Sequence, residues 1–187
     1  MNIVGLLLAG GKSSRYGKQK LFEAYEGRAL FQRSIKAMQN AGISSIYIVT
    51  NRELAPAFEH PVIIEEEPHG GPLHALHTAM EMLPSDWVQV LAGDLPYVDA
   101  PTVETILQTA KAHPSADIIL PTTNGRHQPL HAAYHTRCLP ILRELVENES
   151  SMKALYEAVK TRTLSFSNDH PAFININRPE DWREHHE

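Results

Sequence analysis

The sequence of 187 residues is long enough for one domain with a substantial core, because a chain of this size buries about 70% of its unfolded surface. Its net charge of -5 argues against a nucleic-acid-binding surface, so a bound phosphate must be held by a local basic patch. No apolar run approaches the roughly 20 residues that cross a bilayer, and the single cysteine, Cys138, excludes an intrachain disulfide framework. We therefore expect a cytoplasmic protein without a membrane partner.

The first element is an apolar run, residues 3–9, that meets two glycines and then a short basic loop, AGGKSSRYGKQK. This order is typical of a buried strand that delivers a phosphate-binding loop at its C-terminal end. Gly10 and Gly11 allow close approach of a ligand to the backbone, and Arg15 and Lys20 supply positive charge. The alternative is an ordinary strand-to-helix turn followed by a solvated basic loop.

Two common glycine motifs do not fit this loop. A Walker loop requires Ser or Thr after its lysine, whereas Gln19 follows Lys18 here. The dinucleotide fingerprint GxGxxG fails because Lys12 occupies its third position.

Strand-like and helix-like segments alternate through the rest of the chain. Hydrophobic patterning predicts strands at 44–50, 61–67, 86–94 and 116–122, a returning strand at 130–135, and helices over 31–41, 72–83 and 100–110, the last capped by Asp99. This alternation predicts a three-layer α/β/α, Rossmann-like fold, in which helices cover both faces of a mostly parallel, twisted sheet.

Several polar or glycine residues directly follow predicted strands. They are Gly10, Asn51, Asp94 and the acidic run Glu65 to Glu67. Ligands in open parallel sheets bind beyond the carboxyl ends of the strands, so we expect these residues to gather on one edge.

Asp94, in the motif LAGDLP, is a candidate metal ligand. Mg²⁺ prefers hard oxygen ligands and typically takes one or two carboxylates together with substrate phosphates and water. The alternative is a turn or capping role, because Pro96 and Asp99 follow closely.

The acidic run and the glycines after it also allow two interpretations. Glu65 to Glu67 is either a solvated turn or a source of one carboxylate for a base or ribose. Gly70 and Gly71 precede a helix, as an ordinary entry turn or as a route for the backbone past a ligand.

Three histidines four residues apart, His127, His131 and His135, would share one face of a strand or helix. They could line a polar groove, whereas a zinc site would lack any established ligand spacing. Cys138, in an apolar helix-like run, is interpreted as a core residue rather than a reactive thiol.

Near the end of the chain, Asn175 and Asn177 in FININRPEDW lie two residues apart and so face the same side of an extended segment. They either end a last strand and cap a helix or contact a polar second substrate.

Taken together, LLLAGGKSSRYGKQKLF, EEEPHGGPL, LAGDLPYVDA, HQPLHAAYH and FININRPEDW resemble, in this order and spacing, the molybdenum cofactor guanylyltransferases, which are MobA-like nucleotidyltransferases. The resemblance covers essentially the whole chain. It implies a single nucleotidyltransferase domain over residues 1–187 with the nucleotide-diphospho-sugar transferase type of α/β fold. It also implies transfer of GMP from GTP to molybdenum-bound molybdopterin, with Mg²⁺ required and pyrophosphate released.

The resemblance also implies roles for individual residues. The nucleotide would be held by Leu8, Ala9, Gly10, Gly11, Lys20, Asp94 and Glu66, or Glu65 in place of Glu66. Asp94 would bind Mg²⁺, Arg15 and Lys20 would stabilise the leaving pyrophosphate, and Asn175 and Asn177 would serve the pterin substrate. The implied partners are GTP, molybdopterin, other cofactor-biosynthesis proteins and acceptor molybdoenzymes.

The sequence departs from the family pattern at Tyr16, where methionine is usual, at Gln19, where aspartate is frequent, and at His74 with Ala75, where a small pair commonly follows GPL. The LAGG spelling resembles guanylyl-transferring members, whereas cytidylyl-transferring relatives more often carry LAAG. Alternatives are therefore a molybdopterin cytidylyltransferase, a sugar-phosphate nucleotidyltransferase, or a non-catalytic nucleotide-binding module.

Overall fold

The computed structural model describes residues 1–10, 20–65, 70–177 and 180–181. The predicted site residues Gly11, Arg15 and Glu66 lie outside these ranges. The helices are α1 (Leu30–Asn40), α2 (Gly71–Met82), α3 (Ala100–Ala112), α4 (Leu139–Glu147) and α5 (Met152–Ala158), with short 3-10 helices η1 (Lys20–Phe22), η2 (Ala55–Ala57), η3 (Pro129–His131), η4 (Thr136–Cys138) and η5 (Pro171–Phe173). The strands are β1 (Ile3–Leu8), β2 (Ala24–Tyr25), β3 (Arg28–Ala29), β4 (Ser45–Thr50), β5 (Val62–Ile64), β6 (Trp87–Ala92), β7 (Ile118–Thr123), β8 (Arg126–His127), β9 (Ala133–His135) and β10 (Thr161–Ser165). None of the described helices is both long and apolar enough to span a membrane.

The main sheet of the described residues has eight strands in the order β10-β7-β9-β6-β1-β4-β5, and β8 pairs with β7. Strand β1 runs parallel to β4 and β6, β4 to β5, and β7 to β10. Strand β9 is antiparallel to both of its neighbours, β6 and β7. No long helix separates β7 from β9, so the chain returns in the opposite direction at β9. The other long strands pair in parallel, and the prediction of a mostly parallel sheet is confirmed.

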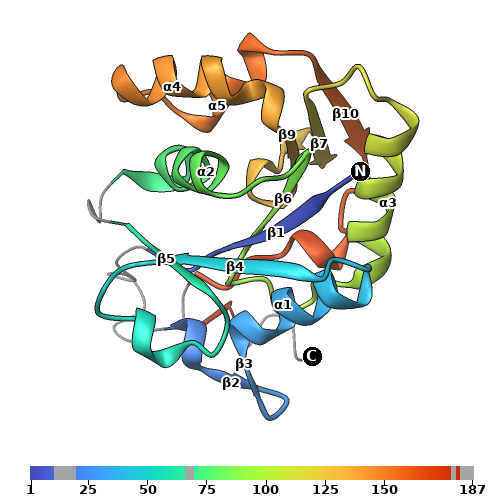
Figure 1. Ribbon diagram of the computed structural model, residues 1–187. Helices are drawn as coiled ribbons and strands as arrows, with labels where there is room; N and C mark the ends of the chain where they lie inside the picture. Colours follow the sequence, from blue (N-terminus) through green and yellow to red (C-terminus); the bar gives the residue numbers. More distant parts are fainter. Residues whose placement is uncertain (11–19, 66–69, 178–179, 182–187) are drawn as a thin grey trace.

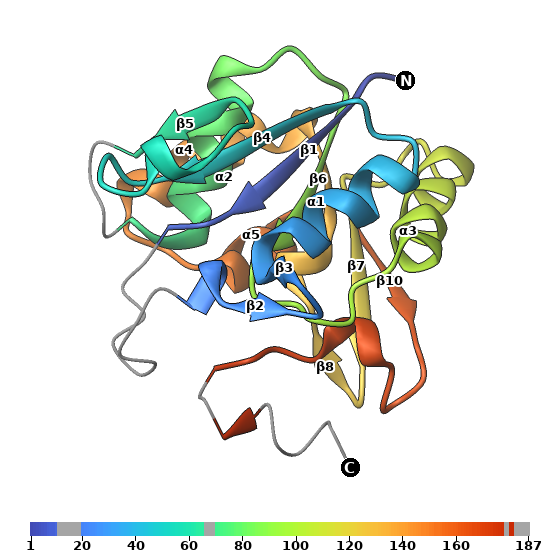
Figure 2. The same ribbon diagram turned by 90° about the horizontal axis from the view of Figure 1, so that it is seen from below.

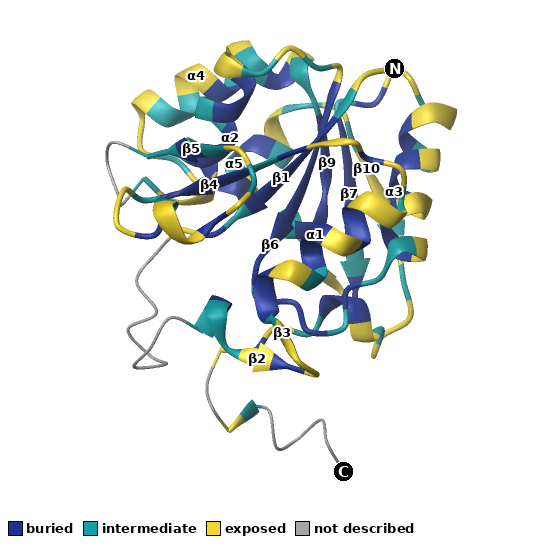
Figure 3. Ribbon diagram, turned by 60° about the horizontal axis from the view of Figure 1, so that its bottom comes forward, coloured by how far each residue is buried: buried dark blue, intermediate teal, exposed yellow. Residues whose placement is uncertain are grey.

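Helices cover both faces of the sheet, as predicted (Figure 1). Leu6 of β1 packs in a core cluster with side chains of α2, α4 and α5, whereas its neighbour Leu7 packs in a second cluster with side chains of α1 and α3. Alternate residues of a strand point to opposite faces, and a strand buried on both faces needs apolar residues throughout. Figure 3 shows the central strands buried and the outer sides of the helices exposed. The three-layer α/β/α architecture is therefore confirmed.

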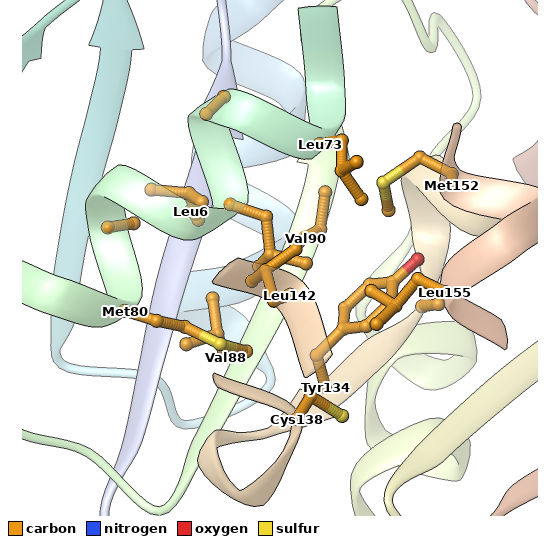
Figure 4. Packing of buried hydrophobic residues seen from close by; sticks show 14 of the residues in the cluster. Leu6, Leu73, Met80, Val88, Val90, Tyr134, Cys138, Leu142, Met152 and Leu155 are labelled. Carbon is orange, nitrogen blue, oxygen red and sulfur yellow. The ribbon is translucent and has the colours of Figure 1, made fainter. Parts of the chain in front are cut away.

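Figure 4 shows the first of these clusters, in which Tyr134 of β9 lies among apolar side chains of the helices. The Tyr134 hydroxyl donates a hydrogen bond of 2.6 Å to the Pro129 carbonyl oxygen, which satisfies its polar end. Cys138 is fully buried in the same cluster, where burial raises the pKa of its thiol to about 12. A thiol with so high a pKa is protonated near neutral pH, so Cys138 is a core residue, as expected.

Two helices begin or end at the residues that the sequence predicted. Helix α3 begins after Asp99, whose carboxylate accepts a 2.8 Å hydrogen bond from the Thr102 amide, and Pro101 occupies its first turn. Such a cap contributes about 1 kcal/mol. Helix α1 ends before Gly42, which adopts a positive φ of 91° that glycine accommodates without strain.

The prediction that the three histidines share one face is wrong. The expected strand over 130–135 is shortened to β9, with η3 before it, and this turn breaks the spacing. His127, His131 and His135 therefore pack against three different rings, those of Tyr156, Phe173 and Trp87 respectively. Among the described residues, no group of three or more His, Cys, Asp or Glu side chains is arranged to hold a metal ion.

Candidate functional site

The carboxyl ends of four parallel strands lie side by side and carry the residues that the sequence placed there. Leu8, the last residue of β1, is in register with Val49 of β4 and Ala92 of β6. Gly10, Asn51, Glu65 and Asp94 follow β1, β4, β5 and β6, so they lie along one edge, as predicted. The Asn51 side chain accepts a 2.8 Å hydrogen bond from the Leu54 amide and so has a local role in its turn.

Backbone contacts fix the point where β1 ends. The Ala9 amide donates to the Val49 carbonyl oxygen at 2.9 Å, and the Ala9 carbonyl oxygen accepts from the Thr50 hydroxyl at 3.0 Å. The Leu8 carbonyl oxygen accepts from the Gly93 amide at 3.3 Å. Gly10 is the first residue beyond these internal contacts and is exposed to solvent.

Glu65 lies directly beside Gly10. A Cβ added at Gly10 would be 3.0 Å from Glu65 Oε2, a distance that forces the carboxylate to move. Glu65 is only partly exposed, and burial raises the pKa of its carboxyl. The acidic run was interpreted either as a solvated turn or as a source of one carboxylate for a ligand, and the position of Glu65 beside Gly10 favours the second. Glu66 and Glu67 lie outside the described residues.

A second glycine allows η1 to pack against the end of β6. A Cβ at Gly93 would be 2.8 Å from the Leu21 side chain, so a larger residue would force that side chain to move. Because Leu21 is buried next to Gly93, its neighbour Lys20 is brought to Asp94. The glycine in LAGD is thus explained by this close packing.

Lys20 is the centre of the site. Its Nζ lies 2.8 Å from Asp94 Oδ2, 3.0 Å from the Ile176 carbonyl oxygen and 3.4 Å from Asn177 Oδ1. The side chains of Lys20 and Asp94 are 17% and 19% exposed, so solvent screens their attraction only in part. An ammonium has three N–H donors, and each of them has an oxygen partner here.

The late asparagine segment docks onto this pair. Ile176 is fully buried, while Asn175 and Asn177 on either side of it are exposed, as expected for an extended segment. The Ile176 amide donates to the Asp94 carbonyl oxygen at 3.1 Å. Figure 2 shows the segment after η5 at the same end of the molecule as β2 and β3. Asn175 and Asn177 share the exposed side of an extended segment, as expected, but this segment is not a strand of the sheet.

Sequence reasoning missed the residue that holds the loop after Asp94. Arg33 of α1 donates a 3.1 Å hydrogen bond to the Pro96 carbonyl oxygen, forms an ion pair with Glu26, and lies 4.4 Å from the centre of the Tyr25 ring. The loop is therefore tied to α1 and to the β2–β3 hairpin. No local pattern marks Arg33, because its contact with Pro96 joins residues that are 63 positions apart.

A buried histidine stands at the same end of the sheet. His131 packs against Phe173 with ring centres 4.6 Å apart, and neither of its ring nitrogens has a hydrogen-bond partner among the described residues. Burial lowers the pKa of His131 to about 3, with the nearby Asp99 opposing this shift and His170 adding to it. This imidazole is neutral at physiological pH.

Comparison with known proteins places the whole arrangement in one family. Residues 5–163 match the MobA-like NTP transferase domain. The chain belongs to this family. A probable molybdenum cofactor guanylyltransferase of Halalkalibacterium halodurans is 31% identical over 191 residues, which cover 97% of this chain and 96% of that protein.

Solved structures show the same MobA-like fold. The molybdopterin-guanine dinucleotide biosynthesis protein A of Archaeoglobus fulgidus superposes with a TM-score of 0.77 at 19% identity, covering 97% of this chain and 95% of that one. A Mycobacterium tuberculosis H37Rv protein in complex with manganese superposes with a TM-score of 0.71 at 17% identity, covering 98% and 97% of the two chains. At these identities the likeness establishes the nucleotidyltransferase fold.

Proposed function

We propose that this MobA-like protein transfers GMP from GTP to molybdopterin, forming molybdopterin guanine dinucleotide and releasing pyrophosphate. The observation that carries the proposal is the meeting of Lys20, Asp94 and Asn177 at the carboxyl edge of the sheet. This meeting supports the proposal because it would bring a lysine for the phosphates, a carboxylate for the metal and an amide for the acceptor to one place. The 31% identical relative, named a probable molybdenum cofactor guanylyltransferase, supports the choice of substrates.

The nucleotide would lie along the ends of β1 and β5. Because the Ala9 amide and carbonyl are engaged with β4, Gly10 is the first residue whose backbone faces outward toward a base or ribose. Glu65, next to Gly10, offers a carboxylate to the N–H donors of guanine. Gly11 and Glu66 would complete the proposed nucleotide contacts, whereas the carbonyl oxygens of the other two predicted residues, Leu8 and Ala9, already accept hydrogen bonds from the protein.

The site residues fit a bound Mg²⁺ ion. Asp94 Oδ2 and Asn177 Oδ1 both converge on the Lys20 ammonium, so this point already accommodates a positive charge with hard oxygen ligands. Few protein ligands are needed, because substrate phosphates and water supply the rest. Asp94 would hold the ion, which would neutralise negative charge on the phosphates when bound. The manganese complex of the mycobacterial neighbour supports a divalent cation in this fold.

Lys20 must change partners during the reaction. Its three donors are satisfied by protein oxygens, so contact with a triphosphate requires it to give up at least one of them. The contact with Asn177, at 3.4 Å, is the longest and therefore the weakest. Lys20, assisted by Arg15, would then stabilise negative charge on the leaving pyrophosphate.

The chemical step requires positioning rather than a protein base. An oxygen of the ionised molybdopterin phosphate attacks the α-phosphorus in line, a new phosphorus–oxygen bond forms, and the bond to the bridging oxygen of pyrophosphate breaks. Asn175 and Asn177 would orient the acceptor, since both amides are exposed beside Lys20. Molybdopterin and the acceptor molybdoenzymes would reach the protein in the cytoplasm, through other cofactor-biosynthesis proteins.

The decisive experiment measures pyrophosphate release with molybdopterin and GTP, CTP or UTP in turn, in the presence of Mg²⁺. We expect turnover with GTP and at least about tenfold less with the pyrimidine nucleotides, because a missing hydrogen-bond partner costs more than 1 kcal/mol. A preference for CTP would indicate a cytidylyltransferase. A rise in melting temperature with nucleotide but no turnover would overturn the enzymatic proposal.

A further inference from the structure

Ile176 contacts both charged residues of the site through its backbone. Its amide donates to the Asp94 carbonyl oxygen at 3.1 Å, and its carbonyl oxygen accepts from Lys20 Nζ at 3.0 Å. The two neighbouring residues, Asn175 and Asn177, are exposed, whereas Ile176 itself is fully buried. The backbone of Ile176 therefore contacts Lys20 and Asp94 of the proposed nucleotide subsite, while its two neighbours belong to the proposed acceptor subsite.

The Ile176 side chain anchors this segment to α1. It forms a separate small buried cluster with Leu30, the first residue of α1. The Leu30 amide donates to the Glu23 carbonyl oxygen at 3.0 Å, and the Glu23 amide donates to the Lys20 carbonyl oxygen at 3.1 Å. Ile176 thus reaches Lys20 by two routes, directly at the ammonium and indirectly through Leu30 and the backbone of η1.

We propose that Ile176 is a positioning residue for the transferase site. Packing against Leu30 fixes its backbone, and that backbone sets the place of the Lys20 ammonium and of the loop that carries Asp94. The same packing presents Asn175 and Asn177 to the acceptor. This inference rests on the proposed function for the identity of the substrates.

The test uses three variants of the full chain. Ile176→Ala removes the side-chain contact with Leu30, and Ile176→Val retains most of it. Ile106→Ala is the matched control, because Ile106 is also a fully buried isoleucine but packs with Trp87 and Ala110 away from the site. Thermal unfolding of all three variants measures the general cost of a core cavity.

The first readout is independent of turnover. Water proton relaxation measures how tightly Mn²⁺ with GTP binds in the absence of acceptor. We expect Ile176→Ala to weaken this binding about tenfold or more, because a small displacement of positioned groups has large effects. Ile106→Ala and Ile176→Val should bind within about twofold of wild type.

The second readout is kinetic. Ile176→Ala should lower kcat about ten- to a hundredfold at saturating substrates. When Lys20 is already replaced by Met, the further change Ile176→Ala should cost much less, because Ile176 acts in part through Lys20.

Equal losses in Ile176→Ala and Ile106→Ala, or fully additive losses in the double variant, would overturn the positioning role. These outcomes differ from a failure of the proposed function. If the wild type releases no pyrophosphate, the binding of Mn²⁺ with GTP still distinguishes Ile176→Ala from Ile106→Ala.

Discussion

The two ends of the sheet each carry an aspartate paired with a cation, but the two pairs are built differently. At the carboxyl end, Lys20 contacts Asp94 through one ammonium that is shared among three oxygens. At the amino end, Arg137 Nε donates to Asp117 Oδ1 at 3.0 Å, and Arg137 Nη2 donates to the Pro114 and Ala116 carbonyl oxygens at 2.9 and 2.8 Å. The Asp117 carboxylate also accepts from the Lys160 amide at 3.1 Å.

The difference follows from the chemistry of the two cations. A guanidinium is a planar fork that makes several directed contacts at once, so Arg137 fastens the start of β7 to the end of β9 permanently. An ammonium is a point charge on a flexible stem and exchanges partners at little cost. A lysine therefore suits the end of the sheet where, in the proposed function, a triphosphate would displace one of its contacts.

The largest effect that we expect comes from Asp94→Asn. It preserves the shape of the side chain but removes the charge that pairs with Lys20 and that the proposed metal ion would require, so kcat should fall about a hundredfold or more. The melting temperature should change by only a few degrees. Pyrophosphate release and thermal unfolding measure the two effects. Asp117→Asn should show the reverse pattern, with lower stability and nearly unchanged kcat; if both variants behave alike, the contrast between the two ends is wrong.

Lys20→Arg should lower kcat about tenfold or more although the charge is retained. The oxygens of Asp94, Ile176 and Asn177 all converge on one nitrogen atom, whereas a guanidinium spreads its donors over three nitrogens in a rigid plane and so reorients less easily toward a phosphate. Steady-state kinetics with GTP varied at saturating molybdopterin measure the loss, and Lys20→Met shows how much of it charge alone explains. Full activity in Lys20→Arg would show that partner exchange is not required.

The histidines of the two ends should differ in their pH dependence. His131 has a pKa of about 3 in the folded protein against an ordinary value of 6.5, so the unfolded chain binds its proton first as the pH falls. The contribution of His131 to the free energy of unfolding should therefore be fully present above pH 6.5. It should decline as the pH falls toward 3, by up to about 1.4 kcal/mol per pH unit. Denaturant titrations measure the slope, which His131→Phe should reduce.

Asp99 and His170 act on the His131 pKa and should be left unchanged in that experiment. His135, at the amino end, has its pKa lowered mainly by burial and is the control, because it is less deeply buried and should contribute a smaller slope. An undiminished slope in His131→Phe would assign the pH dependence to other groups.

The smallest effect that we expect is that of Arg137→Lys, about 1 kcal/mol of stability. A lysine cannot reach Asp117 and the two carbonyl oxygens at once, but these groups are close to solvent and can be hydrated. Chemical denaturation measures the loss, with kcat as the control. A loss of activity larger than the loss of stability would mean that the amino end communicates with the site.

Much of the fold was predictable because the central strands of its sheet are buried on both faces. Apolar runs such as the one before Gly10 identified the central strands, and the parallel topology alone placed Asn51, Glu65 and Asp94 on one edge. Strand β10 and helix α5 were not predicted. In β10 the side chains are largely exposed at the edge of the sheet, so no apolar run or alternation marks it.

The site was predicted as separate parts but not as a contact. Sequence motifs assigned Lys20 to phosphates, Asp94 to a metal and Asn177 to an acceptor, yet nothing local predicts that their side chains touch. That contact depends on how Ile176 packs against Leu30, which is a property of the folded chain. Arg33 was missed for the same reason.

The hydrogen bond between Lys20 and Ile176 joins residues that are 156 positions apart. Closing so large a loop costs conformational entropy, which earlier formation of the sheet reduces, so we expect this contact to form late in folding. During refolding, secondary structure should therefore appear before the protein can bind nucleotide. Nucleotide binding would thus indicate that the segments near both ends of the chain, and not only the core, have reached their native positions.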